Sequence, residues 1–437
     1  MTSPLGSRPV GRLLWQACSQ TTLSVGVYGI YALTNAAFVA RGVGPSAMAA
    51  VNLVAPVLLV LGAVSTTVGV GGASLVSRSL GAGDPLSAAR AAGNAFALFW
   101  ATAAVITVVG LIALGPLLAL LGDTTGASRG YAGIILAGAL VSTGFSSLVR
   151  AEGRMRFSTL IWVAAVLLQI ILDPVLIFGL HLGVRGAALG TVGGQSVSAG
   201  LSMWFFFVQR DRPYRIRRSD LVFHGPTVRA LVGVGAPSFL TGLGATLLAL
   251  LVNKSLGATS ALAAYAVCAR IQTFVMMPQL GISQGLQPIV GYNTGRGLVT
   301  RVARARALAL RASLLYGFLV AAAVVLFAGP LVGFFLGAGP TASTGRGALR
   351  IIGLGFAFAG VTPLVSAYCQ AVGRAGPSYL ISIGTLLLVK APLVLLLGRT
   401  GVTGVWTALA LGELVSATLA LILSYPRASA TGRPNPA

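Results

Sequence analysis

Long uncharged stretches follow one another along most of the chain, and polar residues gather in the short segments between them. A helix needs about 20 apolar residues to cross the hydrocarbon core of a membrane. Eight windows of at least that length carry no charge: 13–40, 42–77, 91–122, 130–149, 186–209, 230–253, 312–345 and 351–373. Four further apolar segments carry one charge each: 157–180, 261–285, 378–397 and 402–424. This pattern predicts twelve membrane-spanning helices.

The windows are apolar on every side rather than alternating, as the run from Ile161 to Leu172 shows. Alternation of polar and apolar residues is typical of a membrane β-barrel, so that class is excluded. The apolar stretch behind Arg8 and Arg12 is too long for the apolar core of a signal peptide, and we interpret it as an uncleaved first span. We therefore predict an all-α, multi-pass integral membrane protein.

Composition narrows the class further. Charged residues make up 8% of the 437 residues, whereas soluble proteins carry about 25%. Such a chain cannot cover a water-facing surface of its own size, which excludes a soluble enzyme, a disordered chain and a secreted disulfide scaffold. The net charge is +23, but the arginines stand singly or in short runs, without aromatic residues for stacking on bases. We expect no nucleic-acid partner.

The basic residues are divided unequally between the two ends of the predicted spans. If the N-terminus is cytoplasmic, 21 of the 30 Lys and Arg residues fall on the cytoplasmic side and 7 on the outer side. The remaining two, Arg270 and Lys390, lie within spans. This bias predicts that both termini are cytoplasmic. Most of the positive charge then contacts anionic lipid headgroups.

One long polar segment, residues 209–229, follows the sixth predicted span. It divides the chain into two halves of equal span number. We therefore predict three parts: an N-terminal six-helix lobe (1–208), a cytoplasmic linker (209–229), and a C-terminal six-helix lobe with a short cytoplasmic tail (230–437).

The two halves repeat one another. Matching positions are Gly71 with Gly285 and Gly81 with Gly295 at an offset of 214, and Pro174 with Pro392 and Gly194 with Gly412 at an offset of 218. Six spans per repeat make the repeats parallel, which is typical of secondary transporters that alternate access around a central site. The chain lacks a Walker A motif and an HExxH motif. We expect a transporter rather than an enzyme.

Several motifs together resemble one transporter family. They are GVGPSAMAAVNLVAPV (42–57), RAEGRMR (150–156), ILDPVLIFGLHLGVRGAALGT (171–191), NKSLGATSALAAYAVCARIQTFVMMPQLGISQGLQPIVGYNTGR (253–296) and GVWTALALGELVS (404–416). Their order and spacing are similar to the multidrug and toxic compound extrusion (MATE) family, in particular its DinF-like bacterial branch.

This resemblance implies two pseudo-symmetric six-helix lobes around a V-shaped cleft, and export of small molecules coupled to inward Na+ or H+. It also implies the plasma membrane of a bacterium as the location. The expected partners are a small-molecule substrate and membrane lipids. We expect a monomer with no cofactor other than the coupling ion.

The family's cation site maps onto four positions of the first lobe. By motif they are Asn35, Gln169, Asp173 and Thr191. The sequence departs from the family pattern twice, because Asn35 replaces an Asp and Gln169 replaces an Asn. Na+ prefers several hard oxygen ligands with negative charge nearby, so a single Asp favours H+ and leaves Na+ at Asp173 as the alternative.

Asp173 is costly as an ion in hydrocarbon, and burial favours the neutral carboxyl form that exchanges protons. Gln169 and Asp173 are four residues apart and share one helix face. We expect Gln169 or Thr191 to be the hydrogen-bond partner of Asp173. The alternative to a coupling role is a structural acceptor beside the Pro174 kink.

The second half holds three charged residues within spans. Glu413 and Lys390 fit an ion pair that fixes this part of the lobe, although Glu413 is also the next candidate for coupling. Arg270 has three options: pairing with Glu413, binding an anionic part of a substrate, or bonding backbone carbonyls. An adaptable cleft wall is predicted from Met and polar residues on the eighth span: Phe274, Met277, Gln284 and Gln287.

Two functions compete at this point. A drug or metabolite antiporter fits the motifs and the twelve spans. A flippase for a lipid-linked precursor is the alternative, because the wider superfamily contains such proteins and Arg270 and Lys390 suit phosphates. An intramembrane enzyme would need a cluster of acid, base and nucleophile, which the sequence lacks.

Overall fold

The computed structural model describes residues 4–42, 45–120, 127–141, 145–257 and 259–425, and these residues form helices without any strand. Nine helices in this part of the chain are long and apolar enough to cross a membrane. Three more, α2 (Val10–Gly42), α3 (Pro45–Ala82) and α9 (Gly183–Met203), occupy the remaining predicted windows. The all-α fold of twelve transmembrane helices is confirmed.

The first lobe contains the helices up to α9. Besides α2, α3 and α9, these are α1 (Pro4–Ser7), α4 (Pro85–Ile112), α5 (Leu114–Leu120), α6 (Ala127–Ala137), α7 (Ser146–Ala151) and α8 (Met155–Pro174). In the fourth span, α6 is followed by a 3₁₀ turn, Gly138–Val141, and α7 begins at Ser146. The fifth ends in a π-helical turn, Val175–Gly179, directly after Pro174. Proline lacks the backbone N–H that would continue the regular ladder, which accounts for the change of helix type at this point.

The second lobe repeats this arrangement. Its helices are α10 (Gly225–Leu256), α11 (Ser260–Gly295), α12 (Val299–Leu326), α13 (Ala328–Leu336), α14 (Pro340–Ala359), α15 (Val361–Val372), α16 (Ala375–Tyr379), α17 (Ala391–Leu397) and α18 (Val402–Ser424). The eleventh span includes two π-helical turns, Leu380–Gly384 and Leu386–Lys390, between α16 and α17. The expected C-terminal tail lies outside the described residues beyond Tyr425.

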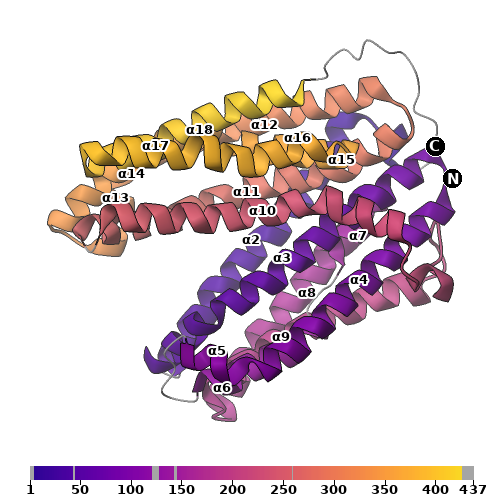
Figure 1. Ribbon diagram of the computed structural model, residues 1–437, viewed down its shortest axis with the longest axis horizontal. Helices are drawn as coiled ribbons and strands as arrows, with labels where there is room; N and C mark the ends of the chain where they lie inside the picture. Colours follow the sequence, from indigo (N-terminus) through magenta and orange to yellow (C-terminus); the bar gives the residue numbers. More distant parts are fainter. Residues whose placement is uncertain (1–3, 43–44, 121–126, 142–144, 258, 426–437) are drawn as a thin grey trace.

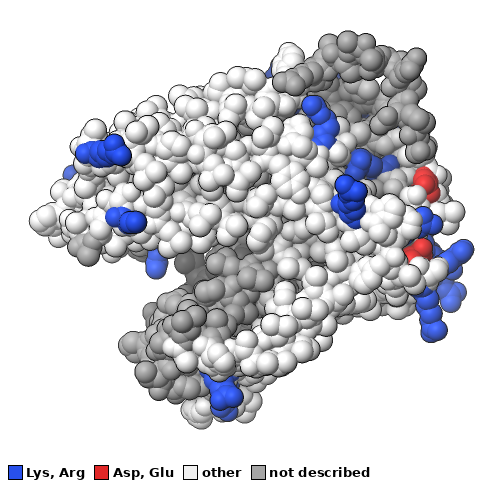
Figure 2. All heavy atoms as spheres, viewed as in Figure 1, with Lys and Arg blue, Asp and Glu red and all other residues white. Residues whose placement is uncertain are grey.

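The two lobes form the arms of a V (Figure 1). They meet at the end where α2 begins and α11 finishes, which we call the closed end, and they separate towards α5, α6 and α13. The space-filling view shows the molecule hollowed between the arms (Figure 2). On the predicted topology, the closed end is cytoplasmic and the hollow opens to the outside.

Glycines allow the lobes to approach closely at the closed end. A Cβ on Gly71 would overlap the Leu231 carbonyl group, and a Cβ on Gly285 would overlap the backbone of Ala17 and Cys18. These contacts join α3 to α10 and α2 to α11, the two most extensive helix pairs between the lobes. Backbone-to-backbone contact of this kind is possible only where a side chain is missing.

Equivalent residues of the two lobes make equivalent contacts across the closed end. A Cβ on Gly81 would overlap the Tyr292 carbonyl oxygen, and a Cβ on Gly295 would overlap the Arg78 carbonyl oxygen. Both Gly81 with Gly295 and Arg78 with Tyr292 differ by 214 in residue number. Each lobe therefore offers the other the same contact, as expected for parallel repeats related by a twofold axis.

The linker is fixed to the first lobe by a buried ion pair. Arg212 pairs with Glu152, and their side chains are 1% and 0% exposed. The Arg212 guanidinium also lies 4.4 Å from the ring centre of Phe206 and 4.7 Å from that of Tyr214, which are cation–π distances. Burial raises the pKa of the Tyr214 hydroxyl well above its usual value.

Asn94 makes a second attachment of the linker. This fully buried amide of α4 donates to the carbonyl groups of Asp220 (2.9 Å) and Val222 (3.2 Å) and accepts from the His224 N–H (2.8 Å). Helix α10 begins at the next residue, Gly225, inside the range expected for the linker. Residues 212–224 are thus held by the first lobe.

The N-terminal segment crosses to the second lobe. The Leu5 carbonyl accepts hydrogen bonds from Asn293 Nδ2 (3.0 Å) and Arg301 Nη2 (3.3 Å), and Arg301 Nη2 also donates to the Arg8 carbonyl (2.7 Å). The Leu5 side chain is buried and touches the position where Gly153 of the first lobe would carry a Cβ. Residues 5–8 therefore connect both lobes at the closed end.

Candidate functional site

Asp173 lies inside the first lobe, one residue before the helix break at Pro174. Its side chain is 1% exposed. Asn35 Nδ2 of α2 donates a hydrogen bond of 2.8 Å to Asp173 Oδ2. The other carboxyl oxygen, Oδ1, has no hydrogen-bond partner among the described residues, and it occupies the space beside Gly190 of α9, where a Cβ would overlap it. The carboxyl group is thus half satisfied.

The partner of Asp173 differs from the one expected. Gln169 Nε2 donates to Thr191 Oγ1 at 2.8 Å, and Thr191 Oγ1 donates to the Ala187 carbonyl at 3.0 Å. The expectation that Gln169 or Thr191 bonds Asp173 is wrong. Gln169 does share the helix face of Asp173, but its amide nitrogen reaches across to α9.

The structure brings the four predicted positions of the first lobe together. They come from three helices: Asn35 from α2, Gln169 and Asp173 from α8, and Thr191 from α9. The group contains one carboxylate and otherwise neutral amide and hydroxyl groups. Its formal charge of one matches a single proton or a single monovalent cation.

In the second lobe, Lys390 Nζ lies 2.6 Å from Glu413 Oε1. The side chains are 20% and 14% exposed, so the pair is mostly shielded. Glu413 therefore has Lys390 as its ionic partner. Arg270 does not pair with Glu413, an option that the sequence left open. The contribution of the three residues to transport stays a prediction.

Two of the four predicted cleft residues, Met277 and Gln284, lie on the face of α11 that meets the first lobe. Met277 packs on Gly29 of α2, where a Cβ would overlap its sulfur. Gln284 accepts a hydrogen bond from Arg150 Nη2 (3.2 Å), and Gln287 donates to Gln370 Oε1 (3.4 Å). Gln284 and Gln287 therefore lie deep in the V, near the closed end, whereas Phe274 is exposed further out.

A polar connection between the lobes was not predicted from the sequence. Ser74 Oγ donates to the Gln370 carbonyl at 2.6 Å, and Gln370 Nε2 donates to Ser238 Oγ at 2.8 Å. The Arg150 bond to Gln284 also crosses between lobes. No spacing in the sequence marks these residues as partners.

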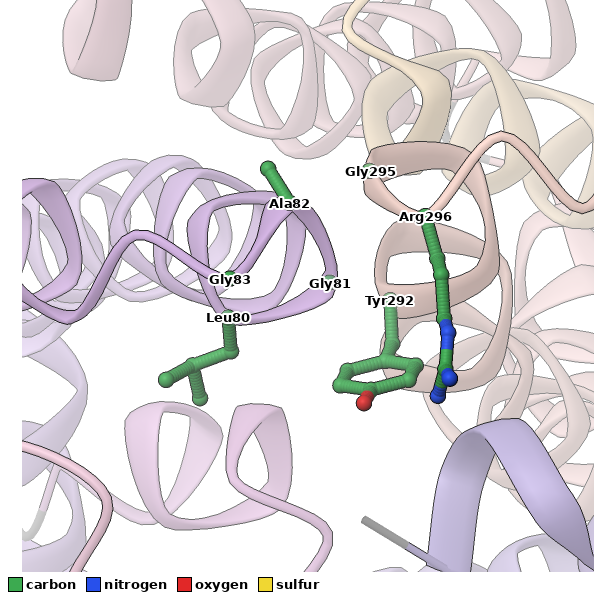
Figure 3. Close-up of a pocket in the computed structure, with 7 residues that line it drawn as sticks. All are labelled: Leu80, Gly81, Ala82, Gly83, Tyr292, Gly295 and Arg296. Atoms are coloured by element: carbon green, nitrogen blue, oxygen red, sulfur yellow. The ribbon is translucent and has the colours of Figure 1, made fainter. Parts of the chain in front are cut away.

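An open pocket of about 510 Å³ lies at the closed end, between the last turns of α3 and α11 (Figure 3). Seven residues line it: Leu80, Gly81, Ala82, Gly83, Tyr292, Gly295 and Arg296. The side chains of Leu80, Tyr292 and Arg296 point to the same side. Apart from Arg296, the lining is made of glycine, apolar and aromatic residues.

Two pseudo-symmetric six-helix lobes around a hollow, with one buried acid within a span of the first, are the architecture of a secondary transporter. The MatE family model matches residues 22–175 and 237–396, one segment in each lobe. The chain belongs to this family of membrane transporters.

Individual relatives agree with the family over nearly the whole chain. The chain is 27% identical over 421 residues to a multidrug export protein MepA of Staphylococcus haemolyticus, covering 91% of this chain and 89% of the relative. It is 26% identical over 346 residues to an FAD transporter of Shewanella oneidensis, covering 75% of each.

Solved structures share the fold. One, described as the outward-facing conformation of a multidrug resistance MATE family transporter of the MOP superfamily, matches with a TM-score of 0.90 at 24% identity, over 97% of this chain and 98% of that one. Another, MATE in the straight conformation, also has a TM-score of 0.90, at 25% identity and 96% coverage of both chains.

Proposed function

We propose that this protein is an antiporter that exports small organic molecules across a bacterial plasma membrane in exchange for inward protons. The observation that carries the proposal is the half-satisfied carboxyl group of Asp173, buried within a lobe of a MatE-family transporter. The names of the relatives support organic substrates, since they include multidrug export proteins and an FAD transporter.

The charge state of Asp173 sets how strongly it holds Asn35. An ionised carboxylate accepts a stronger hydrogen bond than a neutral carboxyl group. A proton that reaches Oδ1 from the wide end of the V removes the cost of the buried charge and weakens the bond to Asn35.

Helix α2 carries Asn35 and also forms half of one interlobe helix pair, through Ala17, Cys18 and Gly29. A change in the Asn35 contact therefore acts on a helix that touches both lobes. This is the route by which protonation favours one orientation of the lobes over the other.

Na+ is the weaker candidate for the coupling ion. A sodium site here would combine Asp173 with the side-chain oxygens of Asn35, Gln169 and Thr191, and it would hold one negative charge. Hard cations are held best by several oxygens with more than one carboxylate. A proton needs only one basic oxygen.

Transport in proteoliposomes tests this proposal. Export of a panel of fluorescent organic compounds is followed while a pH gradient and a Na+ gradient are imposed separately. We expect transport with the pH gradient alone. Transport driven only by Na+ contradicts the proton assignment, and movement of a lipid-linked sugar with none of the soluble compounds contradicts the antiporter.

A further inference from the structure

The acidic residues in the described part of the chain lie away from the opening between the lobes, and Asp123 falls outside that part. The sequence contains seven: Asp84, Asp123, Glu152, Asp173, Asp211, Asp220 and Glu413. Only Asp173 and Glu413 fall within spans; Asp173 is buried, and Glu413 is paired with Lys390. The acidic atoms visible in Figure 2 lie at the closed end. Burial thus shields Asp173 from a molecule in the hollow, and Lys390 neutralises Glu413.

Arg270, unlike the two spanning acids, is accessible to a molecule outside the lobe. It lies on α11, its side chain is exposed, and it forms no ion pair among the described residues. Arg270, Met277 and Gln284 are spaced by seven residues and so share one face of the helix. Met277 and Gln284 both contact the first lobe, so this face of α11 is turned towards that lobe.

The position along α11 places Arg270 where the lobes have separated. It lies two helical turns from Met277, about 10 Å further towards the wide end. An unpaired guanidinium within a span is costly in lipid, so it requires water or an anion. The hollow between the arms supplies the water.

A second basic group adds to the positive potential deeper in the V. Arg150 is largely buried, donates to Ser158 and Gln284, and has no acidic partner among the described residues. Charges between low-dielectric walls act more strongly than charges at a free surface. The hollow is therefore positively polarised, which disfavours cations and attracts anions.

We propose that the cleft recognises substrates that carry an anionic group, a carboxylate or a phosphate, and that Arg270 binds this group. This inference rests on the transport function proposed above and specifies its substrate class. The planar guanidinium accommodates two oxygens of such a group at once. Phe274, one turn away and 41% exposed, offers an apolar ring to the body of the substrate.

Dye binding to the full-length protein in phosphatidylcholine nanodiscs tests the inference without any gradient. The probes are 5-carboxyfluorescein, an anion, and ethidium, a cation, each followed by fluorescence polarisation. We expect tighter binding of carboxyfluorescein. Arg270→Gln should weaken it about tenfold or more, the size of one charge-assisted hydrogen bond, whereas Arg270→Lys should retain most of it. Arg399→Gln, which removes an exposed cation in a loop beside α18, is the matched control and should bind like the wild type.

Arg270→Glu provides an independent check, because it should reverse the preference in favour of ethidium. Nanodiscs with added phosphatidylglycerol distinguish the source of the anion: competition with carboxyfluorescein identifies a lipid headgroup, and no competition identifies a soluble anion. Ethidium binding as tightly as carboxyfluorescein, no binding of either dye, or unchanged carboxyfluorescein binding in Arg270→Gln overturns the inference. Intact binding without gradient-driven export instead contradicts the proposed function.

Discussion

At the scale of single residues, the proposed coupling rests on the burial of Asp173. Its Oδ2 has one donor, Asn35, and its Oδ1 has none among the described residues. A buried carboxylate normally collects two or three donors, and each missing one costs free energy. Burying an amide at this position would cost less free energy than burying an acid. An acid kept at such a position is the arrangement expected of a proton-binding group.

We predict that Asp173→Asn abolishes export driven by a pH gradient and leaves substrate binding detectable. Asn has nearly the same shape, so the packing against Gly190 is kept, but it takes up no proton at physiological pH. Proteoliposome export and dye binding are measured on the same preparation. Export at the wild-type rate would move the coupling site elsewhere, with Glu413 the next residue to test.

A companion variant examines the choice of ion. Asn35→Asp places a second carboxylate within hydrogen-bond distance of Asp173, which restores the charge that Na+ sites use. We expect export by this variant to gain a dependence on Na+. Export that stays indifferent to Na+ shows that charge at position 35 does not select the ion.

The Lys390–Glu413 pair is predicted to act as a structural unit. Replacing one partner by a neutral residue leaves a poorly solvated charge and should cost about 3 kcal/mol of stability. The exchanged pair, Lys390→Glu with Glu413→Lys, should recover part of this loss. Thermal unfolding in detergent compares the three variants; a double variant no more stable than the single ones would refute the pairing.

The sequence predicted which residues gather in the first lobe but not which of them are hydrogen-bonded to one another. The motifs identified Asn35, Gln169, Asp173 and Thr191, and the structure places them together. Which amide bonds Asp173 depends on the rotation of α2 and α9 about their axes, and a sequence window does not contain that angle. The same holds for Arg150 and Gln284, which belong to different lobes.

At the scale of helices, close backbone contact governs how the lobes meet. We predict that Gly235→Ala disturbs the closed end, because its Cβ would overlap the Thr67 carbonyl of α3. Overpacking of this kind costs about 1–3 kcal/mol. To measure this, Arg90 of α4 and Arg304 of α12, both exposed, are each replaced by a spin-labelled cysteine. Electron–electron distances between the two labels should show a wider closed end.

Gly233→Ala is the matched control for this experiment. It lies two residues away on α10, has no atom within 4 Å of its Cβ position, and gains the same helix propensity from alanine. We expect label distances like those of the wild type. Equal effects of the two substitutions would mean that helix propensity, not interlobe contact, determines the result.

The helices themselves were largely predictable, because hydrophobic length is a local property. The changes of helix type within the spans were less predictable. Pro174 predicted a bend in the fifth span, but the π-helical turns in the eleventh span do not begin directly after a proline. Residues 4–10 resemble an ordinary polar terminus, and their attachment to Asn293 and Arg301 goes through backbone carbonyls, which leave no mark in the side-chain pattern.

At the scale of the whole molecule, the distribution of charge predicts the orientation in the membrane. Single cysteines placed in the linker at Ser219 and in an outer loop at Arg399 are labelled with a membrane-impermeant maleimide on intact cells. We expect labelling at position 399 only, and labelling at 219 after the cells are opened. Labelling of position 219 in intact cells would invert the topology and turn the hollow towards the cytoplasm.

The repeat has one further consequence, for residues on the twofold axis itself. Ser77 and Gly291 are equivalent positions, 214 apart, and they face each other: a Cβ on Gly291 would overlap Ser77 Oγ. In a homodimer of two identical half-length chains, the residue on the axis meets its own copy, so both copies would have to be glycine. Joining the halves in one polypeptide removes that constraint. One half keeps the glycine, and the other is free to carry a hydroxyl group, which here donates to the Ser74 carbonyl at 3.2 Å.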